Sequence, residues 1–210
     1  MINITPKIII GLGTGRCGTV FLSEFLKHQP KTESCSHESI KYTFTECNIN
    51  TTYKQLKDAN CINKQNSVAI ISAFALLGVD EISKFFQETK LIILIRNKDK
   101  LIKSFMNWTK DGPPNNYWVP NTKNIWHQTS WECYFPKFPE LEEKTKEEAI
   151  SAYYDYYYDI CNILSKKYDS LWINTEYLND INTLNKILDF CGLDKPGVFG
   201  DFFRNSRPYS

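Results

Sequence analysis

The chain has 210 residues, of which 42% are hydrophobic and 23% charged, and this predicts a single globular domain spanning residues 1–210. A formal net charge of +1 and apolar runs far shorter than about 20 residues argue against a nucleic-acid partner and a membrane span. Seven irregularly spaced cysteines without a Cys-x-x-Cys pair, and no signal peptide pattern, predict reduced thiols, a cytoplasmic location and no metal site.

Strands and helices alternate along the predicted chain. In chain order we expect a strand over 7–12, a helix over 18–28, a strand over 32–36, a polar segment with weak helical signals over 39–65, a strand over 67–73, a helix over 79–88, a strand over 90–95, a helix over 99–108, a long loop over 110–140, a helix over 143–168, a strand over 170–174 and a helix over 178–191. Loops as long as 110–140 tend to be functional.

This alternation predicts an α/β fold with a mainly parallel sheet and helices on both of its faces. Ligands in such folds bind beyond the carboxyl ends of the strands. The two best-defined strand ends are the glycine-rich turn after Leu12 and Arg96 after Ile95. We expect the glycine-rich turn and Arg96 to lie on the same side of the sheet, at the carboxyl ends of their strands.

The stretch from Lys7 to Leu26, KIIIGLGTGRCGTVFLSEFL, joins the first strand to the first helix through that glycine-rich turn. Backbone N–H groups in such a turn and the dipole of the following helix favour a phosphate. Arg16 adds a permanent positive charge with a planar set of donors, and Thr19 adds a hydroxyl group. The turn therefore predicts a phosphate-binding site.

Two general phosphate-binding motifs fit the turn in part. Gly13 and Gly18 have the spacing of a Walker A motif, but Thr19 stands where lysine is required, which disfavours a small-molecule kinase. The dinucleotide motif Gly-x-Gly-x-x-Gly is met by Gly13, Gly15 and Gly18. Glu38 follows at a suitable distance for a ribose contact. A non-transferring nucleotide- or dinucleotide-binding protein of the Rossmann type and a kinase are therefore the alternative functions.

The segment GTGRCGTVFL also resembles the phosphosulfate-binding loop of sulfotransferases that use 3′-phosphoadenosine-5′-phosphosulfate (PAPS). In that family the loop wraps the 5′-phosphosulfate. The resemblance implies that cofactor contacts come from Thr14, Gly15, Arg16, Cys17, Gly18, Thr19 and Val20. The chain departs from the family pattern at Cys17, usually serine, at Val20, usually threonine, and at Gly15, often proline.

A second family signature is an arginine at a later strand end, followed eight residues on by a serine in the next helix. The segment LIILIRNKDKLIKSF supplies Arg96 and Ser104 at this spacing. The resemblance implies that both hold the 3′-phosphate. The segment INTEYLND is similar to a late part of the family, and Lys195–Phe202 and Arg204 are further candidates for 3′-phosphate contacts.

The resemblance implies a P-loop-NTPase-like sulfotransferase fold and a transferase that needs no metal. Such an enzyme moves a sulfuryl group from PAPS to a hydroxyl or amine of a small-molecule or glycan acceptor and releases 3′,5′-ADP. Arg16 would stabilise the leaving phosphate. Glu38 or, next, His37 would accept the acceptor proton, since both follow the second strand.

Overall fold

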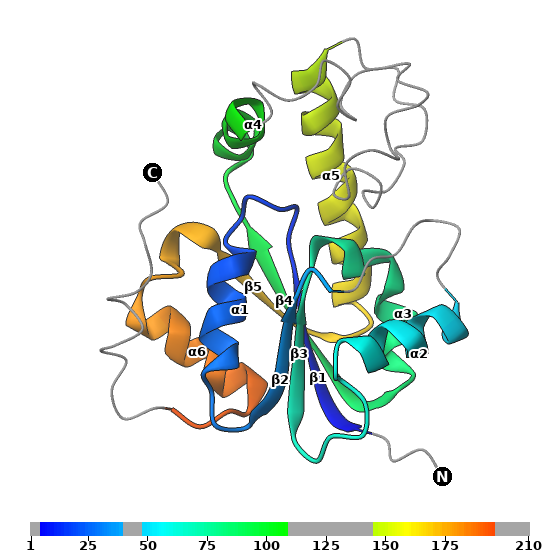
Figure 1. Cartoon of the computed structure of the whole chain (residues 1–210). Coiled ribbons are helices and arrows are strands. Elements are labelled where there is room, and N and C mark those ends of the chain that lie inside the picture. The colour runs from blue at the N-terminus through cyan, green and yellow to red at the C-terminus, as the bar shows by residue number, and fades with distance from the viewer. Residues whose placement is uncertain (1–4, 40–47, 109–144, 196–210) are drawn as a thin grey trace.

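The computed structural model describes residues 5–39, 48–108 and 145–195, and five of its segments form one parallel sheet (Figure 1). The strands lie in the order β2-β3-β1-β4-β5. Their bounds are Thr5–Leu12 for β1, Thr32–His37 for β2, Ser67–Ile71 for β3, Phe86–Ile95 for β4 and Asp169–Asn174 for β5. The predicted parallel sheet is confirmed.

Helices cover both faces of this sheet. Figure 1 shows α1 and α6 on one face and α2, α3 and α5 on the other, with α4 beyond the carboxyl ends of the strands. Their bounds are Thr19–Lys27 for α1, Ile49–Asp58 for α2, Val79–Ser83 for α3, Lys98–Trp108 for α4, Lys146–Ser165 for α5 and Ile181–Cys191 for α6. Two short 3-10 helices, η1 (Ala73–Gly78) and η3 (Thr175–Tyr177), follow β3 and β5.

The core lies on both sides of the three central strands. Ile8, Ile9 and Ile10 of β1 are all fully buried, and so is every residue of β3 from Val68 to Ile71. A parallel sheet covered by helices on both faces buries consecutive residues, which explains continuous apolar runs in place of alternation. This core fixes the positions at which the strands end.

Several predicted elements shift by two or three residues at their ends, and the structure differs most clearly from the predictions at two places. The helix predicted over 79–88 ends at Ser83, and β4 begins already at Phe86, which pairs with Thr5 of β1. Pairing with a central strand outweighs the local helical pattern there. Within the weakly patterned segment 39–65, residues 49–58 form α2, whose N-cap Asn48 accepts hydrogen bonds from two backbone N–H groups.

The sheet order separates this fold from the dinucleotide-binding one. In the classical dinucleotide-binding order β1 lies beside β2, whereas here β3 lies between them. The predicted Rossmann-type alternative therefore does not fit the topology. All five strands run the same way, so the glycine-rich turn, Glu38, Ser72 and Arg96 all follow carboxyl ends at one edge of the sheet.

Candidate functional site

The glycine-rich turn, residues 13–18, connects β1 to α1 in a conformation that depends on its glycines. A Cβ atom on Gly13 would lie 2.3 Å from Sγ of Cys17, and one on Gly18 would lie 2.6 Å from Cδ1 of Leu178. Gly18 has φ 87° and is the N-cap of α1, which makes no side-chain cap hydrogen bond. The turn is therefore closely packed, and it leads into the positive end of the α1 helix dipole, which favours an anion.

Two arginines meet at this turn from different strand ends. Nη1 of Arg96, the residue after β4, donates a hydrogen bond to the carbonyl oxygen of Arg16 at 2.7 Å. Nε of Arg16 in turn donates to Oγ of Ser104 on α4 at 3.3 Å. The three residues predicted for the two ends of one nucleotide thus lie together. Ser104 contacts Arg16, although the sequence pattern pairs it with Arg96.

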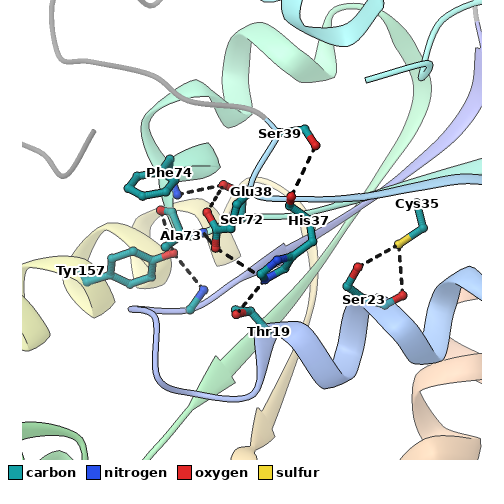
Figure 2. A network of polar contacts seen from close by, with 11 residues as sticks. Thr19, Ser23, Cys35, His37, Glu38, Ser39, Ser72, Ala73, Phe74 and Tyr157 are labelled. Atoms are coloured by element: carbon teal, nitrogen blue, oxygen red, sulfur yellow. Dashed lines mark hydrogen bonds and ion pairs between the residues drawn. The ribbon is translucent and has the colours of Figure 1, made fainter. Parts of the chain in front are cut away.

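A carboxylate lies beside the turn, at the end of β2 (Figure 2). Glu38 Oε2 accepts a hydrogen bond from Oγ of Ser72 at 3.0 Å, and its Oε1 accepts one from the backbone N–H of Ala73 at 3.4 Å. Its side chain is 11% exposed. Its φ of 55° is in the left-handed region, which a non-glycine residue rarely adopts. Such backbone strain is commonly found at functional sites.

His37 connects this carboxylate to the first residue of α1. Its Nε2 lies 3.2 Å from Oγ1 of Thr19 and 3.7 Å from Oε1 of Glu38 (Figure 2). Burial lowers the pKa of His37 below 6.5, and the charge of Glu24 only partly opposes this. Burial therefore favours the neutral ring at pH 7, and its Nε2 donates or accepts according to its tautomer.

The remaining predicted loop residues contribute mainly through their backbone. The Cys17 side chain is fully buried, and burial raises the pKa of its thiol from 9.0 to about 12. Thr14 is also buried, and its hydroxyl donates to the carbonyl oxygen of Gly15 at 3.2 Å. Val20 is 45% exposed on the first turn of α1. Hence an anion at this turn would meet the Cys17 backbone N–H and not its thiol.

Several residues at the site were missed by the sequence analysis. Four tyrosines of α5 donate hydroxyl hydrogen bonds to backbone carbonyls at the strand ends: Tyr153 to Thr14, Tyr154 to Arg96, Tyr157 to Ala73 and Tyr158 to Leu94. Thr175 Oγ1 lies 2.9 Å from the Cys17 carbonyl oxygen and 3.1 Å from that of Ile95. The signal was the segment YYDYYYD, in which two adjacent tyrosines, 153 and 154, recur four residues later at 157 and 158 and so share one helix face.

Some predicted features lie outside the described residues, namely the loop 110–140, Arg204 and most of 195–202. In the described ranges, no group of three or more His, Cys, Asp or Glu side chains could hold a metal ion. None of the helices in the described part of the chain is long and apolar enough to cross a membrane.

A separate hollow of about 570 Å³ lies between α4 and α5. Its described lining includes Ile102 of α4 together with Ser151 and Asp155 of α5. Arg16, Arg96 and Glu38 are not part of that lining. The hollow is therefore distinct from the residues predicted to bind the donor.

Comparison with known proteins agrees with this architecture. No protein-family model matches the chain, and no curated protein matches it. The sulfotransferase domain of the curacin biosynthetic pathway is 13% identical with a TM-score of 0.59, over 93% of this chain and 77% of that domain. The sulfotransferase domain of the Synechococcus PCC 7002 olefin synthase is 14% identical with a TM-score of 0.57, over 92% and 76%.

A sulfotransferase from Alicyclobacillus acidocaldarius is 15% identical with a TM-score of 0.54, over 90% of this chain and 81% of that protein. At these identities the likeness concerns the arrangement of strands and helices. It agrees with the five-stranded parallel sheet and with helices on both of its faces. This chain therefore has the sulfotransferase fold.

Proposed function

We propose that this chain is a PAPS-dependent sulfotransferase acting on a hydroxyl or amine of a small-molecule or glycan acceptor. The observation that carries the proposal is the contact between the two predicted phosphate-binding segments, in which Arg96 Nη1 donates to the Arg16 carbonyl at 2.7 Å. A single nucleotide with phosphates on both its 5′ and 3′ positions suits two cations placed at neighbouring strand ends. Neither a Walker A lysine nor a dinucleotide-binding sheet order is present to favour the alternatives.

The glycine-rich turn is the proposed site of the 5′-phosphosulfate. Gly13 and Gly18 leave no space for a Cβ atom, so the turn packs closely against Cys17 and Leu178. The start of α1, whose N-cap is Gly18, adds the positive end of the helix dipole. The guanidinium of Arg16 would add positive charge where negative charge develops on the leaving phosphate.

Arg96 and Ser104 are the proposed ligands of the 3′-phosphate. Arg96 is half-buried, and Tyr154 donates to its carbonyl oxygen at 3.0 Å, so its backbone is held in place. Ser104 Oγ accepts from Arg16, which leaves its own hydroxyl hydrogen for a phosphate oxygen. The two side chains then supply charge-assisted hydrogen bonds that a ligand without a 3′-phosphate could not use.

Glu38 is the proposed general base. PAPS supplies the sulfuryl group: a bond forms from the acceptor oxygen or nitrogen to sulfur, and the bond from sulfur to the 5′-phosphate oxygen breaks. The acceptor loses its proton to the Glu38 carboxylate, which Ser72 orients. His37 is the second candidate, since its neutral ring lies 3.7 Å from the same carboxylate. A cytoplasmic location is proposed with this function, because the five described cysteines are free thiols.

Calorimetry tests the donor part of this proposal. We expect 3′,5′-ADP to bind at least about tenfold more tightly than 5′-AMP, because only the former carries the phosphate assigned to Arg96 and Ser104. ATP and NAD serve as controls for the kinase and dinucleotide-binding alternatives. Equal affinity for 3′,5′-ADP and 5′-AMP contradicts the proposal. Tighter binding of NAD than of 3′,5′-ADP would favour the dinucleotide-binding alternative.

A further inference from the structure

The tyrosines of α5 hold the backbone at the carboxyl ends of β1, β3 and β4. Tyr153, Tyr154, Tyr157 and Tyr158 lie at positions that place their rings on adjoining parts of one helix face. Each of them donates its hydroxyl hydrogen to a backbone carbonyl oxygen, at distances of 2.7 to 3.2 Å. Thr14, Ala73 and Arg96 lie just past a strand end, where backbone carbonyls lack a sheet partner, so three of these hydroxyls supply partners for them.

The Tyr157 hydroxyl makes two hydrogen bonds, to two different segments. The hydroxyl oxygen accepts a hydrogen bond from the backbone N–H of Gly13 at 2.9 Å. It donates to the carbonyl oxygen of Ala73 at 3.2 Å. The Tyr157 side chain is only 1% exposed, so neither bond competes with bulk water. One hydroxyl thus joins the start of the glycine-rich turn to the end of β3 (Figure 2).

The same segment after β3 also holds the candidate base. Ser72 Oγ and the Ala73 backbone N–H both donate to the Glu38 carboxylate, at 3.0 and 3.4 Å. Opposite sides of one short segment therefore contact Glu38 and Tyr157. The hydrogen bonds run continuously from Gly13 through Tyr157 and Ala73 to Glu38.

We propose that Tyr157 is a positioning residue that fixes the distance between the glycine-rich turn and Glu38. This inference rests on the proposed function, in which the turn binds the donor and Glu38 takes the acceptor proton. Transfer requires the two to keep one relative position, and a displacement of about 1 Å at such a site can reduce the rate roughly 10²-fold. A donor that restrains the turn would thereby also restrain Glu38 through the Tyr157 hydroxyl.

Hydrogen–deuterium exchange with 3′,5′-ADP tests this link without an acceptor. In the wild-type chain we expect the ligand to slow exchange roughly tenfold in two segments, the turn at 11–19 and the segment 72–78. Tyr157→Phe keeps the ring and removes only the hydroxyl. In this variant we expect slower exchange at 11–19 alone. Slower exchange in both segments of the variant overturns the inference.

Tyr158→Phe is the matched control. Tyr158 is similarly buried, at 6% exposed, and its hydroxyl donates to Leu94 within β4 and lies beside the Thr14 side chain. It therefore contacts the turn, as Tyr157 does, but its partners do not include Ala73. We expect this variant to lose a hydroxyl hydrogen bond and still show slower exchange in both segments. Loss of the effect at 72–78 in this control as well would overturn the specific role of Tyr157, because general loosening of α5 would then explain both variants.

The outcomes separate this inference from the proposed function. If 3′,5′-ADP slows exchange nowhere in the wild-type chain, the proposed function fails. The connection between the turn and the segment 72–78 is then tested by comparing exchange in the ligand-free wild type and the two ligand-free variants. Tyr157→Phe should then speed exchange roughly tenfold in 11–19 and 72–78 together, whereas Tyr158→Phe should leave exchange at 72–78 unchanged. Faster exchange in only one segment overturns the connection through Tyr157.

If Tyr157→Phe does not fold, the Tyr157 hydroxyl proton is followed by NMR in the wild type. A change in its chemical shift on adding ligand supports the connection, and an unchanged shift overturns it.

Discussion

The guanidinium of Arg96 donates to the carbonyl oxygen of Arg16 at 2.7 Å, although 80 residues separate the two in the chain. Arg96 follows β4 and Arg16 lies in the turn after β1, and β1 and β4 are neighbours in the sheet. One arginine therefore both shapes the glycine-rich turn and supplies a charge beside it. A substitution at Arg96 should therefore change both the shape of the turn and the charge beside it.

Arg96→Ala should weaken 3′,5′-ADP binding much more than 5′-AMP binding. Loss of a charge-assisted contact costs about 1.5–3 kcal/mol, which corresponds to a loss of roughly 10- to 150-fold in affinity. Calorimetry with both ligands gives the ratio. Ser104→Ala is the companion variant, since it removes only a hydroxyl and should cause a smaller loss in the same direction. An equal loss for both ligands would mean that Arg96 acts only by shaping the turn.

Gly18→Ala should both destabilise the chain and reduce 3′,5′-ADP affinity at least about tenfold. The new methyl group would lie 2.6 Å from Leu178 Cδ1, at a φ of 87°. Overpacking and left-handed strain together cost about 2–4 kcal/mol in free energy of unfolding, measured by urea denaturation. Gly192→Ala is the control, because Gly192 also has a positive φ, 63°, but ends α6. It should lower stability and leave ligand affinity unchanged.

Glu38→Gln should reduce sulfuryl transfer by roughly 10²- to 10⁴-fold and leave 3′,5′-ADP binding intact, because the amide cannot take a proton. The measurement is transfer of label from ³⁵S-PAPS to the best acceptor in a panel of hydroxyls and amines. Glu33→Gln is a control carboxylate, which accepts hydrogen bonds from the Gln65 and Asn66 backbone near the start of β3. Undiminished transfer in Glu38→Gln would assign the proton to His37, and His37→Gln would then show the loss.

Stability should fall with rising alkaline pH because of the buried thiols. Burial raises the pKa of Cys17 and Cys191 from 9.0 to about 12 and that of Cys61 to about 11. Their contribution is complete below the unfolded value of 9.0 and is lost as pH rises toward the folded values, since only the unfolded thiols ionise in between. Each thiol should contribute a slope of about 1.4 kcal/mol per pH unit.

Urea denaturation between pH 9 and 11 measures this slope. Cys17→Ala removes one of the thiols, so its free energy of unfolding should fall less steeply with pH than that of the wild type. Lysine and tyrosine ionisation affect both proteins alike, and the difference between the two slopes isolates Cys17. Parallel slopes would contradict a buried, protonated Cys17.

The order and type of most elements could be predicted because buried strands and amphipathic helices carry local patterns. β4 could not be delimited in this way. Its first residues, from Phe86, are ordered by pairing with β1, and the local sequence there is compatible with a helix. α2 was equally hard to predict, because only Thr52 and Leu56 of its ten residues are buried and few of its residues are apolar.

The candidate site was predictable only where one short segment carries several of its features. Arg16 is part of a glycine-rich motif and Arg96 follows a clear strand, so both could be named. Ser72 and Tyr157 could not, because their roles depend on partners 34 and 84 residues away. The spacing of apolar residues within one helix or strand gives no information on contacts between residues so far apart in the chain.

The tyrosine hydroxyls that hold the strand ends have a thermodynamic consequence for recognition. A turn that is already ordered loses little conformational entropy when a ligand arrives. Association should then be fast and should show the small heat-capacity change of a rigid surface, without the larger one that accompanies coupled folding. The chain would then bind a nucleotide whose phosphates fit the turn without rearrangement, and it would bind weakly any ligand that requires the turn to change conformation.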